Sequence, residues 1–556
     1  MRKRKPEKSN PRKSLTVFMV AAECRELVKI GGLADVVHDL TRSLTMMGVK
    51  VRIIIPYYEI IDKPAYYTFD LKVEFGASQW PVQVYTHQLG PVPVYLLRNP
   101  TFFGGEFSQV YIDSNKSGRG PFEDDAKRFA FFSAAALQLI QQEYNEQRID
   151  IIHGHDWHTG TLFLLLKYDP RYRLLRKRVK TLYTIHNLDY QGIRPIQIFK
   201  NHLHLSFHDW FPNLWDDLFK KKILRKVLQP FAEDLLYNPM RAGINLADRV
   251  NTVSPTYARE ITRADDPGKN FIGGRELESD LKIRSRKKEL SGILNGLFYE
   301  QYDPSKLDPP FDIHVKNWQQ ARQRHKEAFL RNLRKHIQDL EKRLKKNFPN
   351  SSLILSKLNY FDLQEWLERP LLVAVTRLAR QKLGILLEKH GRKENLLQHV
   401  LKRNIGLIII GNGEFAEELN DINLEPNFYF IWAFDPAIAR LLYVTGDIFL
   451  MPSDFEPCGI SQMIAMRYGC LPLVHDIGGL HDTVRHLQTG FKYRGANRRD
   501  ARNNLLKTLD LALNYYTHHP AKWTAIQTSA MQQRFDWTNS SKEYIALYQG
   551  MRRTKI

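Results

Sequence analysis

Short runs of aliphatic and β-branched residues recur along the chain, with amphipathic stretches between them. Uninterrupted apolar runs of this length are typical of strands buried on both faces, and hence of parallel sheets covered by helices. Several runs end in a glycine or a polar turn that leads into a helical pattern, which indicates βα units. The expected strands form two sets: 16–22, 51–55, 150–153, 181–185 and 249–253 in the first half, and 371–375, 407–410, 428–432, 447–451 and 471–474 in the second.

The two sets predict an α/β protein with two doubly wound domains that face a cleft. Ligands of such sheets bind at the carboxyl ends of the strands, so the cleft is the expected site. We expect five segments: a disordered basic tail at 1–14, an N-terminal domain at 15–300, a linker at 301–370, a C-terminal domain at 371–525, and at 526–556 a C-terminal helix packing back on the N-terminal domain.

The linker contains a highly charged stretch over residues 313–348. Its apolar residues recur at steps of three and four, which predicts one long helix with a single apolar stripe. The stripe consists of Leu330, Leu333, Ile337, Leu340 and Leu344. A basic surface helix is the simpler interpretation, and a docking arm for nucleic acid or membrane is the other. Residues 349–352, Pro-Asn-Ser-Ser, predict the end of the helix and a polar loop.

Composition narrows the class of protein. The 556 residues include 82 Lys and Arg against 60 Asp and Glu, a formal charge of +22. This balance favours anionic partners such as nucleotides, sugar phosphates, nucleic acid or acidic lipid, without selecting one. No apolar run approaches the roughly 18–20 residues of a spanning helix, so we expect no membrane span.

Cysteine usage and the first residues of the chain both favour a cytoplasmic protein. Cys24, Cys458 and Cys470 leave one thiol unpaired in any framework, and no C-x-x-C occurs. The pattern favours a reducing cytoplasm and no structural zinc. The basic start runs into an apolar stretch that lacks a small-residue cleavage site, so we expect no secretory signal.

The first candidate for chemistry is the segment Lys29-Ile30-Gly31-Gly32-Leu33-Ala34-Asp35, which follows the first strand and precedes a helix. Adjacent glycines let the backbone approach a ligand closely, and a helix N-terminus offers unpaired N–H groups to an anion. Lys29 adds a positive charge. An ordinary strand–helix turn is the more common explanation of the pattern, since a lone Gly-Gly is a weak signal.

Two histidine-containing segments follow later strands. His153, His155, Asp156 and His158 have side chains that ligate metals, but a polar strand end lining the cleft is the favoured interpretation. His186, in TIHNLDYQG, either packs as a structural residue or faces a ligand as donor or acceptor.

The second half carries a pair of cations and a turn with a carboxylate. Arg377 and Lys382 follow a strand and are placed to converge on a diphosphate, although solvated surface charge is the usual alternative. Glu456, in FEPCG, would be held by the Pro–Gly turn at the mouth of the cleft, where a carboxylate accepts hydrogen bonds from sugar hydroxyls; a surface turn is the alternative. Cys458 is more consistent with a small packed residue than a reactive thiol.

Together these motifs are far more specific than any one of them. KIGGLADVV, HDWHTG, TIHNLDYQG, ADRVNTVSPTYAREI, SGILNG, TRLARQK, PSDFEPCGISQMIAMRYG and GGLHDTV occur in the order and approximate spacing of one enzyme family. The chain resembles the bacterial glycogen synthases and plant starch synthases over about residues 15–550. The resemblance implies the GT-B fold, two Rossmann-like domains of which the first is on the acceptor side and the second binds the nucleotide sugar.

The resemblance also implies an activity. Such enzymes transfer glucose from a nucleotide-glucose to the non-reducing end of an α-1,4-glucan, with retention and without metal or another cofactor. ADP-glucose is favoured over UDP-glucose as the donor. Partners are then the donor and the glucan, with no nucleic acid expected, and the role is glycogen or starch synthesis in the cytoplasm.

Site roles carry over by motif. The resemblance implies His186, Arg377, Lys382 and Glu456 as the catalytic residues, with His186 on the transferred glucose, the two cations on the leaving diphosphate and Glu456 on glucose hydroxyls. The implied substrate-binding residues are Lys29, Gly31, Gly32, Asp35, Asn295, Cys458, Gly459 and Gly479.

Some positions depart from the family pattern. A glycine usually follows Lys382 directly and is here Gly384, and the usual Gly-Tyr-Asp is Ala433-Phe434-Asp435. The usual Thr-Gly-Gly-Leu begins with Ile477, and the charged stretch from about 334 to 369 has the character of an insertion. The alternatives are a low-activity glucan-binding or regulatory relative, the same chemistry with UDP-glucose, a phosphorylase-type enzyme and a nucleic-acid binder. No pyridoxal-phosphate motif and no basic–aromatic motif is evident.

Overall fold

The apolar runs of the first half form the centre of a nine-stranded sheet. Its strands are, in spatial order, β12 (Leu290–Gly292), β11 (Arg249–Thr252), β7 (Lys180–Ile185), β6 (Ile151–His155), β1 (Thr16–Val20), β2 (Lys50–Pro56), β5 (Val92–Arg98), β4 (Ser78–Leu89) and β3 (Tyr66–Phe75). From β12 to β5 all neighbours are parallel. Burial of these runs on both faces explains why they pair in this way.

The computed structural model describes residues 15–112, 123–195, 207–212, 214, 228–231, 234–347, 362–389, 394–422 and 425–553. The tail at 1–14 and the polar loop at 349–352 lie outside these ranges. Within them, none of the helices is long and apolar enough to cross a bilayer.

One side of this sheet is antiparallel, which the apolar runs did not predict. There β4 pairs antiparallel with both β5 and β3. From Leu71 to Phe75 the side chains of β3 are alternately buried and exposed, because only one face of this edge is covered. Such a strand lacks an uninterrupted apolar run, so the pattern of runs did not reveal it.

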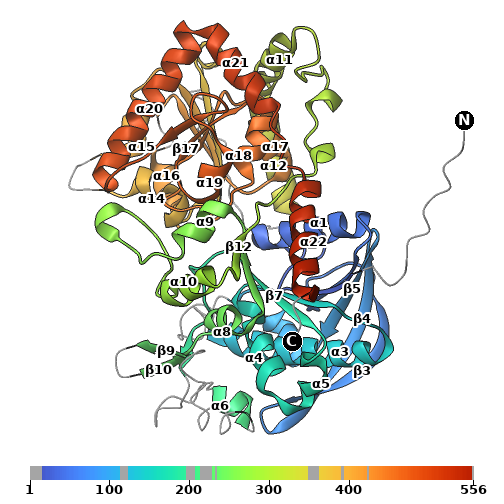
Figure 1. The fold of residues 1–556 in the computed structure, drawn as a ribbon. Helices are drawn as coiled ribbons and strands as arrows, with labels where there is room; N and C mark the ends of the chain where they lie inside the picture. The colour runs from blue at the N-terminus through green and yellow to red at the C-terminus, as the bar shows by residue number, and fades with distance from the viewer. Residues whose placement is uncertain are drawn as a thin grey trace, which may run out of the picture.

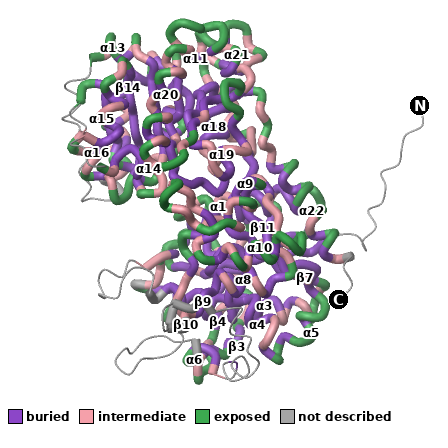
Figure 2. Tube along the Cα trace, turned by 60° about the vertical axis from the view of Figure 1, so that its left-hand side comes forward, coloured by how far each residue is buried: buried purple, intermediate pink, exposed green. Residues whose placement is uncertain are grey.

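The second set forms a six-stranded, entirely parallel sheet. Its order is β15 (Phe428–Trp432), β14 (Gly406–Gly411), β13 (Leu371–Val375), β16 (Ile448–Met451), β17 (Leu471–His475) and β18 (Phe491–Tyr493). Buried segments fill the interior of both bodies in Figure 2. The two doubly wound α/β domains expected from the sequence are therefore present, one above the other in Figure 1.

Helices cover the two sheets. On the first they include α1 (Gly32–Met46), α3 (Glu123–Glu146), α4 (Gly160–Tyr168), α8 (Pro239–Leu246), α9 (Pro255–Glu260) and α10 (Glu278–Arg286). On the second they include α14 (Arg380–Leu387), α15 (Leu396–Leu401), α16 (Ala416–Ile422), α17 (Pro436–Thr445), α18 (Ser461–Arg467), α19 (Gly478–Thr483), α20 (Arg498–His518) and α21 (Pro520–Met531). A small sheet of β8 (Arg194–Pro195), β10 (Asp234–Tyr237) and β9 (Leu228–Phe231) lies apart.

The prediction of one long helix over 313–348 is wrong. Two helices occupy the stretch, α11 (Trp318–Arg331) and α12 (Leu333–Asn347), and they are separated at Asn332. The stripe from Leu330 to Leu340 is buried in a core shared with the second sheet, so the helices are attached to that domain and expose only their polar faces. On α11, Lys326 and Arg322 also form a buried ion cluster with Asp447, which precedes β16.

The last helix returns to the first domain. α22 (Trp537–Arg553) lies beside α1 in Figure 1, and Tyr544 and Tyr548 are fully buried in the core of the N-terminal domain. Ser541 is hydrogen-bonded to Ser43 of α1, with 2.8 Å between the hydroxyl oxygens. The chain end therefore helps to build the domain in which the chain begins.

The two domains touch where α9 meets α19. The Ser254 hydroxyl donates to the carbonyl of Pro457 at 2.6 Å, and the Thr256 amide and hydroxyl donate to the Asp482 carboxylate. The Glu260 carboxylate accepts from the Gly478 amide at 3.1 Å. These bonds hold the carboxyl ends of the two sheets against one shared cavity.

Candidate active site

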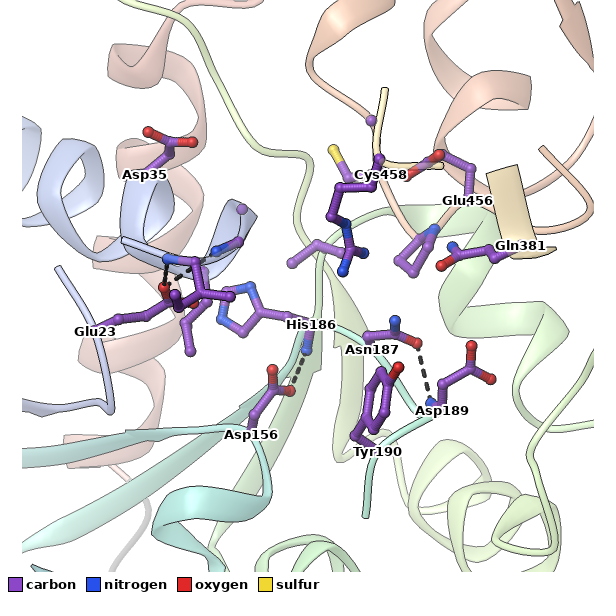
Figure 3. A pocket seen from close by; sticks show the side chains of 18 of the residues that line it. Glu23, Asp35, Asp156, His186, Asn187, Asp189, Tyr190, Gln381, Glu456 and Cys458 are labelled. Carbon is purple, nitrogen blue, oxygen red and sulfur yellow. Dashed lines mark hydrogen bonds between the residues drawn. The ribbon is translucent and has the colours of Figure 1, made fainter. Parts of the chain in front are cut away.

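A cavity of about 700 Å³ lies between the domains and contains nearly all the predicted site residues (Figure 3). It is found where each sheet reverses its strand order, beyond β1 in the first sheet and beyond β13 in the second. In doubly wound sheets this switch point is where neighbouring loops separate and leave room for a ligand. The predicted residues on its walls are Gly31, Gly32, Asp35, His186, Asn295, Arg377, Lys382, Glu456, Cys458 and Gly459.

The glycine loop before α1 differs in two respects from the expectation. The buried Glu23 carboxylate accepts hydrogen bonds from the amides of Ile30 and Gly31, at 2.5 and 3.1 Å. The Gly31 amide, expected to be open to an anion, is therefore occupied. Burial raises the pKa of Glu23, and the two amides oppose that rise. Lys29 does not line the cavity; its ammonium pairs at 2.7 Å with Asp35, which does.

His186 lies at the end of β7, half-buried in the cavity wall. Its amide donates to Asp156 Oδ1 at 2.7 Å (Figure 3), and its Nε2 lies 2.9 Å from Nδ1 of His155 on the neighbouring strand β6. Burial lowers the pKa of His186 to about 3 and raises the pKa of Asp156 to about 7. The imidazole is therefore neutral at physiological pH.

The opposite wall combines cations with a buried carboxylate. Lys382, in the first turn of α14, donates to Oε2 of Glu456, and the Ser453 hydroxyl donates to the same oxygen at 3.1 Å. Arg377 lies two residues beyond the end of β13 and lines the same wall. Burial raises the pKa of Asp189 on the facing domain, while the charges of Arg275 and Arg377 oppose the rise.

The turn after Glu456 is tightly packed. Burial raises the pKa of the Cys458 thiol to about 12, and this thiol contacts Asn295 of the other domain, so it is a packed group rather than a nucleophile. Gly459 has a φ of +76°, which favours glycine. Gly479 does not line the cavity: its amide donates to the Glu456 carbonyl at 3.0 Å, and a Cβ there would lie 2.2 Å from the Cys458 carbonyl oxygen.

Several lining residues were not singled out from the sequence. Glu23, Asp189, Tyr190 and Gln381 all face the cavity. The HDWH segment supplies Asp156, Trp157 and His158 to the wall, in agreement with a polar strand end that lines the cleft. No group of three or more metal-ligating side chains in the described ranges is arranged to hold an ion.

Comparison with known proteins shows what the chain is similar to. A family model described as starch synthase catalytic domain matches residues 16–283, and one described as glycosyl transferases group 1 matches residues 360–516. The glycogen synthases of Moorella thermoacetica and Clostridioides difficile are 32% and 34% identical to the chain. Each alignment covers 96% of this chain, with 96% of the first relative and 99% of the second.

A solved structure agrees with these sequence comparisons. It is the catalytic domain of starch synthase IV from Arabidopsis thaliana bound to ADP and acarbose, which is 27% identical. The match has a TM-score of 0.73 and covers 97% of this chain and all of the solved chain. The likeness therefore extends through both domains.

Proposed function

Since the chain belongs to the family of glycogen synthases and starch synthases, and is thus a glycosyltransferase, we propose that it transfers glucose from ADP-glucose to the non-reducing end of an α-1,4-glucan with retention of configuration. ADP in the related starch synthase structure supports an adenine nucleotide as donor. UDP-glucose is the alternative donor. Three buried free thiols are consistent with action in a reducing cytoplasm.

One observation carries the proposal: both switch points open into the same cavity, and each domain supplies a different set of functional groups to it. His186 and the glycine loop come from the first domain, whereas Arg377, Lys382 and Glu456 come from the second. A donor lying across the cavity would place its diphosphate against the cations of the second domain. Its glucose would lie between Glu456 and His186.

The cations account for the departure of the leaving group. As the bond from glucose to the diphosphate breaks, negative charge accumulates on the phosphate oxygens and the sugar becomes oxocarbenium-like. Arg377 and Lys382 would stabilise that charge more strongly in the transition state than in the ground state. Lys382 is already held in place by Glu456, so little reorganisation is needed.

The carboxylates of the cavity favour a same-face transfer over a double displacement. A covalent intermediate needs a free carboxylate nucleophile, with a second carboxyl group about 5 Å away. Among the described residues, each carboxylate that lines the cavity already has a partner. Glu23 and Asp156 accept backbone amides, Asp35 pairs with Lys29, Asp189 with Arg275 and Glu456 with Lys382. We therefore propose that the departing phosphate takes the proton of the acceptor hydroxyl.

The test is the rate of nucleoside diphosphate release with glycogen as acceptor, measured for ADP-glucose and for UDP-glucose. Faster release from ADP-glucose is expected, and a preference for UDP-glucose would overturn the donor assignment. Arg377→Ala should lower kcat by about 10²–10³-fold, because one preorganised charge donor is lost. Lys402→Ala, which removes an exposed cation paired with Glu394 in the same domain, is the matched control and should leave kcat unchanged.

A further inference from the structure

A line of buried side chains leads from the last helix to the cavity. The hydroxyl oxygen of Tyr548, on α22, lies 2.9 Å from Nδ1 of His153. Nε2 of the same histidine lies 2.7 Å from the Thr184 hydroxyl oxygen. The ring of His153 packs on that of His155 with 4.2 Å between centroids. His155 Nδ1 then lies 2.9 Å from His186 Nε2, so the line ends on the histidine of the cavity wall.

The protonation of His155 follows from its partners. Burial lowers the pKa of both His155 and His186, so both rings are neutral and one proton is shared across the bond between them. His155 Nε2 is buried and has no hydrogen-bond partner in the part of the chain that the structure describes. A buried N–H without an acceptor is rarer and more costly than a bare acceptor. The proton of His155 is therefore on Nδ1.

The consequence falls on His186. If His155 Nδ1–H donates, His186 Nε2 must accept, and the single proton of the neutral His186 ring is on Nδ1. The ring then keeps an N–H donor for a ligand in the cavity that it lines. With the other tautomer, the same nitrogen would present only a lone pair.

We propose that His155 is a positioning residue that fixes His186 in the Nδ1–H tautomer, so that His186 donates a hydrogen bond to an oxygen of the transferred glucose. The inference deepens the proposed function and rests on it. His153 is hydrogen-bonded to Tyr548 and Thr184, and its ring packs against the His155 ring and restricts its rotation. In this way α22, at the far end of the chain, supports the sugar subsite.

The tautomer can be measured without activity. In protein labelled with ¹⁵N-histidine, the signals of His186 are assigned by their loss in His186→Gln. We expect a protonated Nδ1 and a bare Nε2 in the ligand-free enzyme. A proton on Nε2 of His186 would overturn the proposal even if glucose is transferred as proposed. A wild type without transferase activity would overturn the proposed function and the role of His186 on glucose, but not the tautomer assignment.

Two variants give the kinetic test. His155→Phe keeps an aromatic ring against His153 but removes the donor, and should lower kcat/KM for the nucleotide-glucose by about 10–100-fold. His155→Gln retains an N–H donor and should stay within about fivefold of wild type. Affinity for ADP, which has no glucose, should be unchanged in both variants by calorimetry.

Each contrary result has one meaning. Loss of ADP affinity in parallel with kcat/KM would show general damage to the cavity and contradict a role confined to the sugar. Equal activity of His155→Phe and wild type would likewise contradict it. If His155→Phe fails to fold, His155→Gln and the wild-type spectrum still decide the question.

Discussion

Replacing Lys382 with alanine separates two consequences of one ion pair. The side chains of Lys382 and Glu456 are 14% and 8% exposed, and Lys382 is the only cation bonded to Glu456 among the described residues. Breaking a fully buried pair costs about 3–5 kcal/mol. This pair borders a cavity that water enters, so we expect a loss of about 1–3 kcal/mol in the free energy of unfolding.

The catalytic loss should be larger than the loss of stability. Removal of one preorganised donor to developing charge costs about 3–4 kcal/mol in the transition state, a fall of about 10²–10³-fold in kcat. The assays are kcat for ADP release at saturating donor and glycogen, and urea unfolding followed by fluorescence. Arg380→Ala, on the same helix and outside the cavity wall, is the control; its side chain is 77% exposed and we expect kcat to be unchanged.

A double variant shows which effect dominates. Lys382→Ala with Glu456→Gln removes the uncompensated charge, so stability should return towards that of wild type while kcat stays low. If kcat recovers in the double variant, Lys382 serves only to neutralise Glu456. A kcat for Lys382→Ala within tenfold of wild type would refute its role on the leaving group.

The remaining predictions concern pH, stability and metal. Burial, with repulsion from a neighbouring carboxylate, raises the folded pKa of Glu260 to about 7, above its ordinary value of 4.5. Between these two pH values the folded state therefore binds more protons than the unfolded state. The stability of wild type relative to Glu260→Gln should then fall as pH rises from 4.5 to 7. Thermal melts in which this relative stability rises would contradict the prediction. Asp447→Ala should lower the free energy of unfolding by about 3–5 kcal/mol in urea titrations, because the buried cations Lys326 and Arg322 lose their partner. The control Asp339→Ala, at an exposed carboxylate, should change the free energy of unfolding by less than about 0.5 kcal/mol. Transferase activity should persist in excess EDTA, and activity restored only by added metal would contradict charge stabilisation by side chains alone.

Strands buried on both faces were the part of the fold that the sequence revealed best. Runs such as 371–375 and 407–410 have little polar character, and β13 and β14 are buried at every position. The antiparallel strands β3 and β4, on one side of the first sheet, were missed because buried positions in them alternate with more exposed ones. The division between α11 and α12 at Asn332 was also missed, because it occurs without a proline or glycine and depends on how the stripe packs against the second domain.

Site residues that belong to local sequence motifs could be predicted. Site residues whose roles depend on partners distant in the sequence could not. Arg377 lies two residues beyond the end of β13 and Glu456 lies in the turn that follows β16, so their place at the carboxyl edge could be predicted. Glu23 could not, since its partners are amides of a loop that folds back on it. The bond between His155 and His186 joins residues on separate strands, and only the pairing of β6 with β7 brings them together.

The most direct test of the central claim follows labelled glucose from ADP-[¹⁴C]glucose into glycogen and determines the linkage formed. We expect label at non-reducing ends in α-1,4 linkage, with one ADP released for each glucose transferred. Label in β linkage, or ADP release without incorporation into glucan, would contradict retaining transfer in this cavity.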